Sequence, residues 1–110
     1  MADQGKVTIT MTVPESTAYG SAVSGAGTLS ATLRAVGIMA DSTAAGVTTG
    51  PVQIGGTALG IASGSVTAGA HLCATATGAL VVQSTEADDL VCAIALEGAS
   101  DGEMFKVKII

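Results

Sequence analysis

The sequence predicts a small all-β domain, either a β-sandwich or a partly closed β-barrel, with little helix and an extended N-terminal segment. Three observations support this prediction. Several short runs alternate apolar and polar side chains, which is the periodicity of a half-buried strand. Many of the 15 glycines lie between these runs, where turns are expected. No segment has a convincing helical pattern, and the 110 residues have about the length of one domain.

The clearest alternation covers residues 6–13, where threonines take turns with apolar side chains. It predicts a half-buried strand, ended by Pro14, with an apolar face of Val7, Ile9, Met11 and Val13. Residues 15–30 are small, polar and rich in glycine, which predicts a long connection or a weakly ordered arm. Residues 31–45 fit either a strand or a helix that Gly37 would weaken, and we favour the strand.

Further strands are predicted in the second half of the chain. The pair Gly55-Gly56 between residues 52–54 and 57–61 predicts a hairpin, because glycine permits the positive φ of a tight turn. Later strands are expected at 79–82, at 90–96, with both faces buried, and at 103–110. The last has an apolar face of Phe105, Val107 and Ile109, with Lys106 and Lys108 pointing outward.

We therefore predict one β domain over residues 1–110. Its N-terminal strand and a flexible connection rich in Gly, Ser and Thr would take up residues 1–30, and its barrel core residues 31–110. Alanine and valine dominate the apolar residues, with one Phe, one Tyr and no Trp. A core built from such small side chains gives little stability per residue, so we expect additional stabilisation from neighbouring subunits in an assembly.

Charge and composition exclude several classes of partner. The net charge is −5 and the isoelectric point is near 4.4, and the four cations are Lys6, Arg34, Lys106 and Lys108. No basic patch is available for a phosphate backbone, so we expect no nucleic-acid partner. No run approaches the roughly 20 apolar residues of a membrane-spanning helix, and no signal peptide is recognised. We expect no membrane partner, and we expect the protein to stay in the compartment where it is made.

Residues that could carry chemistry are few. His71 is the only histidine and lies near no nucleophile motif, so we interpret it as a structural or solvated side chain. Asp88 and Asp89 are adjacent and would point to opposite faces of an extended chain, which does not make an acid–base pair. Cys73 and Cys92 lie outside metal-clip spacing and are expected to be buried thiols rather than a disulfide or a metal site. We expect no catalytic residue, no cofactor and no metal.

Two oxygen-rich or glycine-rich patterns are weak matches to known sites. The acidic residues at 86–89 and 101–103 lack the twelve-residue spacing of an EF-hand calcium loop. Residues 50–57 have the glycine spacing of a phosphate-binding Walker A loop, but Gly56 stands where its lysine should be. The segment 25–30 ends in Ser30 where a dinucleotide fingerprint requires glycine or alanine.

Four segments in the second half of the chain form a recognisable series: Ser65–Leu72, Thr77–Leu80, Val91–Ala99 and Asp101–Val107. In this order they resemble the capsid cement, or head decoration, proteins of tailed bacteriophages, and the resemblance covers about residues 50–110. The chain departs from the family at Cys92, where glycine is usual, and at His71, where an acidic residue is more frequent. Neither departure affects chemistry, because the family has none.

The resemblance implies a structural virion protein with a small, β-tulip-like barrel, commonly a homotrimer. Such a protein binds the outside of a bacteriophage head between subunits of the major capsid protein and stabilises the shell against genome pressure. Three linked weak contacts would bind far more tightly than one. The N-terminal segment could add a strand to the coat protein through contact residues Lys6, Val7, Thr8, Ile9 and Met11. Alternatively, residues 6–13 are simply the first strand of the barrel.

Other functions remain open from the sequence. A tail or baseplate β-domain would have a similar composition, and we rank it second. A small ligand-binding or carrier β-domain is less favoured, because no lysine occupies a hairpin tip where a lipoyl group could be attached. An enzyme built around His71 is the least favoured interpretation.

Overall fold

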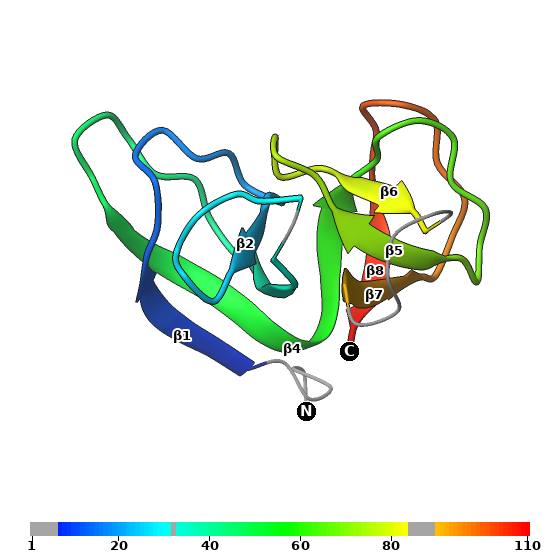
Figure 1. The fold of residues 1–110 in the computed structure, drawn as a ribbon, viewed down its shortest axis with the longest axis horizontal. Coiled ribbons are helices and arrows are strands. Elements are labelled where there is room, and N and C mark those ends of the chain that lie inside the picture. Colours follow the sequence, from blue (N-terminus) through cyan, green and yellow to red (C-terminus); the bar gives the residue numbers. More distant parts are fainter. Residues whose placement is uncertain (1–6, 32, 84–89) are drawn as a thin grey trace.

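The computed structural model describes residues 7–31, 33–83 and 90–110, and within them it shows an all-β fold with no α-helix. The strands are β1 (Val7–Thr12), β2 (Ala22–Ser24), β3 (Ala35–Met39), β4 (Thr49–Ile61), β5 (His71–Ala74), β6 (Leu80–Val82), β7 (Val91–Ala95) and β8 (Met104–Ile109). They form one antiparallel sheet in the order β2-β3-β4-β8-β7-β5-β6, with β1 added to β4 (Figure 1). The predicted fold class is confirmed. No helix in the described residues is long and apolar enough to span a bilayer.

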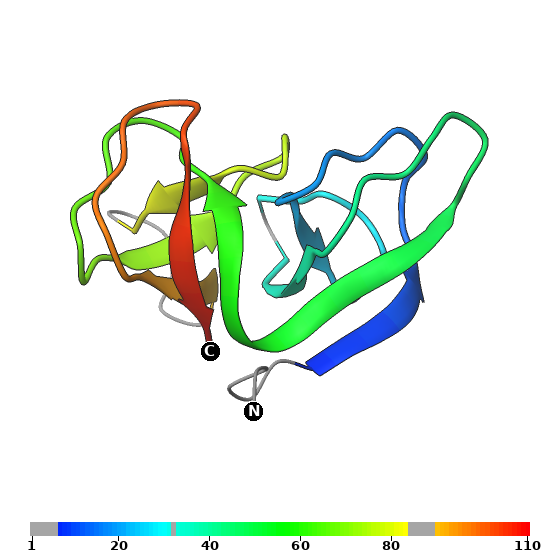
Figure 2. The same cartoon turned by 180° about the vertical axis from the view of Figure 1, so that it is seen from behind.

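Strand β4 organises the molecule because it belongs to two groups of strands. Its first half pairs with β1 and β3, and its second half, from Gly56 to Ile61, pairs with β8. Figures 1 and 2 show β4 as a long curved ribbon that connects the two groups. The predicted hairpin at Gly55-Gly56 is therefore wrong, since these residues lie within one continuous strand. The positive φ of Gly56, 81°, serves a bend in that strand rather than a reversal of the chain.

A buried glutamine holds this bend. The side-chain amide of Gln53 donates hydrogen bonds to the carbonyl oxygens of Gly55, at 2.9 Å, and Thr57, at 2.7 Å. Both carbonyls belong to the segment in which β4 passes from one group of strands to the other. Because Gln53 is buried, these hydrogen bonds replace hydration that the amide has lost.

The second half of the chain forms a nearly closed barrel. Strands β4, β8, β7, β5 and β6 follow one another around it. A bridge between Ala62 and Leu80 and a backbone hydrogen bond from Ser63 to the Leu80 carbonyl bring β6 back to the end of β4. The predicted alternation of the last strand is confirmed, because Phe105, Val107 and Ile109 are buried and the side chains between them are exposed. In β7, Cys92, Ala93 and Ala95 are buried and the other two residues are half-buried.

The first half of the chain contains a buried strand that its sequence did not predict. Residues 15–30 were expected to form an irregular connection, yet they contain β2, whose three residues are almost completely buried. Ala22 and Val23 pair with Ile38 and Gly37 of β3, which places β2 at the end of the sheet. The core therefore also includes residues before position 31, where the predicted core began. The expected strand within 31–45 is confirmed as the shorter β3.

Two clusters of buried side chains make up the core. The larger one fills the barrel and extends to Ala22, Ala35 and Ile38, so it joins the barrel to β2 and β3. The smaller one contains Val13, Val23, Met39 and Val52. Gly37 makes the close packing of β3 on β4 possible, because a Cβ atom there would collide with the carbonyl oxygen of Gln53. The two clusters share no residue, but β2, β3 and β4 contribute to the packing of both.

Candidate functional site

The candidate site is the open edge of β1. This strand pairs with β4 along one edge, with Ile9 opposite Val52 and Met11 opposite Gly50. No other strand of the described chain pairs with its second edge. An unpaired strand edge presents backbone N–H and C=O groups that another strand can bind. Figure 2 shows β1 at the margin of the molecule, beneath the curved part of β4.

The side chains of β1 become more exposed toward its N-terminal end. Val13, just after the strand, is buried, and Met11 is half-buried and packs against the smaller core cluster. Ile9 is 41% exposed and Val7 is 48% exposed. The predicted apolar face exists, but only its C-terminal half contacts the core. The other half exposes two large aliphatic side chains beside an open strand edge.

Most of the predicted contact residues lie on this edge. Val7, Thr8, Ile9 and Met11 all belong to β1, whereas Lys6 lies outside the described residues. The strand contains no charged residue between positions 7 and 12, and charged side chains are a frequent protection of open edges. A register shift between Val7 and Thr8 is the one irregularity of its pairing with β4. The structure also agrees with the alternative interpretation, in that β1 is a strand of the domain itself.

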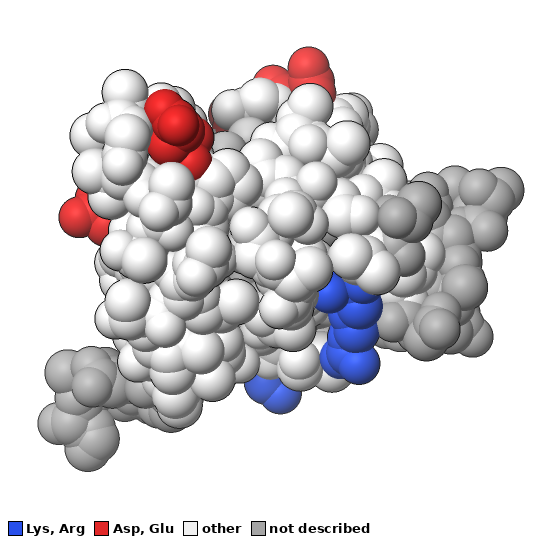
Figure 3. Space-filling model, turned by 60° about the vertical axis from the view of Figure 1, so that its left-hand side comes forward, with Lys and Arg blue, Asp and Glu red and all other residues white. Residues whose placement is uncertain are grey.

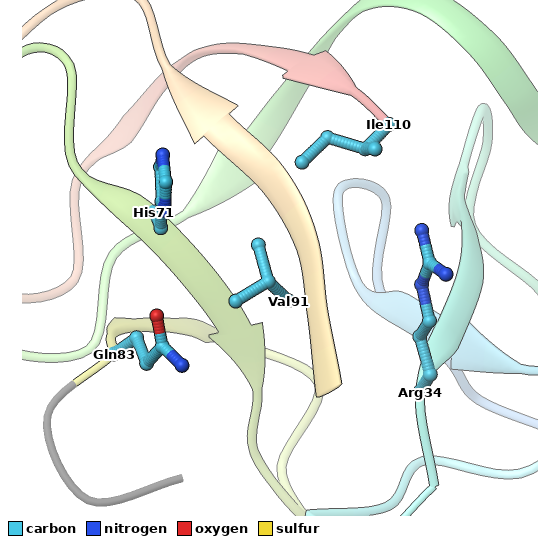
Figure 4. Close-up of a pocket in the computed structure, with 5 residues that line it drawn as sticks. All are labelled: Arg34, His71, Gln83, Val91 and Ile110. Carbon is cyan, nitrogen blue, oxygen red and sulfur yellow. The ribbon is translucent and has the colours of Figure 1, made fainter. Parts of the chain in front are cut away.

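A second candidate is a cleft between β3 and the barrel. Its volume is about 350 Å³, and it is lined by Arg34, His71, Gln83, Val91 and Ile110. Figure 4 shows Arg34 on one side of Val91, and His71 and Gln83 on the other. His71, the residue that the sequence offered for catalysis, thus lines a cleft whose described lining residues carry no carboxylate or thiol side chain. The sequence did not predict this cleft, because its residues come from five separate segments.

The acidic side chains of the loops bind nearby backbone amides. Glu15 accepts a hydrogen bond from the Gly46 amide at 3.0 Å, and Glu97 accepts one from Lys106 at 2.9 Å. In the acidic turn near the C-terminus, Asp101 accepts from Gly64 and Glu103 from Ser100. The structure thus explains these carboxylates by loop geometry. No group of three potential metal ligands is found among the described residues, and 86–89 lie outside them.

Charge is unevenly distributed over the surface. The described anions are Glu15, Asp41, Glu97, Asp101 and Glu103, and the described cations are Arg34, Lys106 and Lys108. On the face drawn in Figure 3, acidic side chains lie in the upper part and basic side chains along the lower part. Figure 1 shows β1 and the C-terminus in the lower part as well. Among the charged residues that the structure describes, the acidic ones therefore lie away from the open edge of β1.

Both cysteines are buried, as the sequence predicts, and no disulfide joins them. Burial raises the pKa of the Cys92 thiol from 9.0 to about 11, and the neighbouring Cys73 thiol adds to this shift. Arg34 opposes the shift, because its positive charge favours the thiolate. A thiol that stays protonated at neutral pH is a poor nucleophile and a poor metal ligand.

The raised pKa of Cys92 predicts a loss of stability at alkaline pH. Between pH 9 and 11 the unfolded chain ionises this thiol while the folded chain keeps its proton, so the free energy of unfolding falls as the pH rises. The expected loss is about 3 kcal/mol, from about two units of pKa at roughly 1.4 kcal/mol each. Urea unfolding of the wild type and of Cys92→Ala over this range measures it. Equal pH slopes in the two proteins would refute the prediction.

Comparison with known proteins identifies a structural relative. No protein-family model matches the sequence, and no curated protein sequence matches it. A solved structure described as head fiber gp8.5 N base in bacteriophage phi29 has a similar fold, with a TM-score of 0.71. The similarity covers 94% of this chain and 95% of that chain, at 16% sequence identity. The fold of this chain is thus shared with the base of a phage head fibre over nearly its whole length.

Proposed function

We propose that this chain is a structural protein of a bacteriophage virion, a capsid decoration (cement) protein on the outer surface of the head. It binds between subunits of the major capsid protein and stabilises the shell against the pressure of the packaged genome. The observation that carries this proposal is the fold shared with a phage head fibre base. The finer assignment to decoration proteins follows the resemblance of sequence segments within residues 50–110, which no protein-family model matches.

The open edge of β1 is the proposed contact with the coat protein. A strand of the coat would pair with the unpaired backbone groups of β1, and the exposed Val7 and Ile9 would enter apolar pockets beside it. Backbone hydrogen bonds then give affinity, and the alternate side chains give specificity. Because β1 already pairs with β4, this contact requires no refolding of the N-terminal segment, unlike a free docking arm.

A homotrimer is the proposed assembly. Phe105 is the single phenylalanine of the chain, and most other buried apolar side chains are small or medium in size. Contacts between copies would add buried apolar surface that this core lacks. On a shell, three linked copies also raise the effective concentration of each further coat contact, so weak single contacts suffice. We propose no catalytic, cofactor or nucleic-acid role.

Substitution on the open edge tests the coat contact. Ile9→Lys places a charge where a partner strand would pack, and it should weaken binding to purified heads at least about tenfold, or about 1.4 kcal/mol. Val47→Lys is the matched control, because Val47 is 43% exposed and lies in the loop before β4. Val47→Lys should change the affinity for heads less than about twofold. Co-sedimentation with heads that lack the protein gives both affinities.

The fold must be intact for this comparison to count. Both substituted side chains are exposed, so we expect the free energy of unfolding of each variant to lie within about 0.5 kcal/mol of the wild-type value. Equal head binding by Ile9→Lys and Val47→Lys would contradict the β1 contact. Absence of head binding by the wild type would contradict the function itself.

A further inference from the structure

The cleft between β3 and the barrel has a lining suited to an acidic ligand. Arg34 precedes β3, His71 begins β5, and Gln83 follows β6, so polar side chains from three distant segments line one cavity. Val91 and Ile110 supply apolar wall. The volume of about 350 Å³ is at the lower end of the range for ligand-binding clefts.

Arg34 is the strongest donor in this lining. Its guanidinium is always charged and can bind both oxygens of a carboxylate through two parallel hydrogen bonds. The side chain is exposed, and no ion pair or hydrogen bond occupies it within the described part of the chain. Because no described carboxylate pairs with this guanidinium, it can act at the cleft as the binding group for a carboxylate of another molecule.

The shape of the cleft favours a peptide over a small anion. In Figure 4, Arg34 stands on the opposite side of Val91 from His71 and Gln83, so the polar groups do not surround a single point. A ligand that reaches both sides must be extended and must cross apolar surface between them. A peptide with an acidic side chain meets this description, because its carboxylate would bind Arg34 and its backbone would accept a hydrogen bond from His71.

The cleft is a separate surface from the open edge of β1. Strands β1 and β3 pair with opposite edges of β4, because Val52 is the partner of both Ile9 in β1 and Met39 in β3, and Arg34 lies just before β3. The described carboxylates of the loops bind backbone amides, and none of these carboxylates is among the lining residues of the cleft. A partner can therefore bind the cleft without occupying the open edge of β1.

We propose that this cleft binds an aspartate or glutamate side chain within an extended segment of a partner protein. The inference rests on the proposed function only for the identity of that partner, which would be the coat protein. The binding chemistry itself depends on Arg34 as the carboxylate anchor, with His71 as a donor to the peptide backbone and Val91 as the apolar surface between them.

Nuclear magnetic resonance titration tests the inference without phage heads. The probe is an acetylated and amidated Ala-Glu-Ala peptide, and the matched control is the same peptide with glutamine. We expect the glutamate peptide to shift the amide signals of His71, Val91 and Ile110, and to bind at least about fivefold more tightly than the glutamine peptide. Succinate, a free dicarboxylate, should bind more weakly than the peptide.

Two charge-matched variants make the result specific. Arg34→Gln should reduce glutamate-peptide affinity at least about fivefold. Lys106→Gln removes the same charge from an exposed position on β8, outside the lining, and should change affinity less than about twofold. Equal affinities for the two peptides, or equal effects of the two variants, would overturn the inference.

Head binding separates this inference from the proposed function. If the wild type binds purified heads but no glutamate-specific shift is seen at the cleft, the cleft proposal fails and the function stands. If the cleft binds the glutamate peptide but the protein does not bind heads, the function fails and the partner is another acidic protein.

Discussion

Replacing Gln53 by glutamate should lower the free energy of unfolding by about 3–5 kcal/mol at pH 7. The Gln53 amide donates to two carbonyl oxygens at 2.9 and 2.7 Å in a buried position. A carboxylate there would face two acceptors without a proton to donate, and it would be an uncompensated buried charge. Such a loss is a large part of the stability of a domain of this size.

Acid pH should partly rescue Gln53→Glu. Burial raises the pKa of the introduced carboxyl in the folded state above its unfolded value, so the folded chain binds the proton more tightly. The destabilisation relative to the wild type should therefore shrink as the pH falls toward 4, because the protonated carboxyl can donate one hydrogen bond. Gln53→Met, which has no charge, should be destabilised by about 2–3 kcal/mol at every pH.

Urea unfolding at pH 7 and pH 4, at one protein concentration, measures both effects. If Gln53→Glu is as stable as the wild type at pH 7, Gln53 does not hold the bend of β4. A destabilisation that is the same at both pH values would show that charge is not its cause.

Replacing Gly27 by alanine should cost about 3–4 kcal/mol of stability. Gly27 has a φ of 77°, which an L-residue adopts only with strain, and an added Cβ would collide with the carbonyl oxygen of Thr12 at the end of β1. The turn after β2 would have to move away from β1. Because the carbonyl oxygen belongs to the backbone, the contact cannot be relieved by a change of rotamer.

Gly102→Ala separates strain from collision. Gly102 has a similar φ of 82°, but an added Cβ would meet no atom within 4 Å. The same alanine substitution should therefore cost only about 1 kcal/mol there. Thermal or urea unfolding of both variants gives the difference, and equal losses would contradict the close packing of the turn on β1.

The sequence predicted the strands whose pattern is local. In β8, Phe105, Val107 and Ile109 alternate with exposed side chains because one face of the strand meets the barrel core and the other meets solvent. In β1 the same alternation was correct, although Val7 and Ile9 extend beyond the core. Alternation indicates which side chains share a face, but it does not indicate where the core ends.

The failures depended on pairing between distant residues. Two glycines permit a tight turn or a bend equally well, and β4 bends because it pairs with β1 and β3 before Gly56 and with β8 after it. Strand β2 is only three residues long and has no readable period, and it is a buried strand because it pairs with β3. The hydrogen bonds of the Gln53 side chain depend on the bend of β4, so the sequence did not predict them either.

The candidate sites divide in the same way. The open edge lies on one continuous strand, so residues 7–11 could be proposed from sequence. The cleft combines Arg34, His71 and Gln83 from segments that the fold brings together, and only the structure places them around one cavity. A single arginine in a sequence gives no sign of such a site.

The proposed function is tested most directly by co-sedimentation of the wild-type protein with purified bacteriophage heads that lack it, together with its native mass in solution. The account predicts saturable binding of a trimer of the 10.6 kDa chain to the outside of the head, and heads that withstand heating better once it is bound. A stable monomer with no affinity for these heads would contradict it.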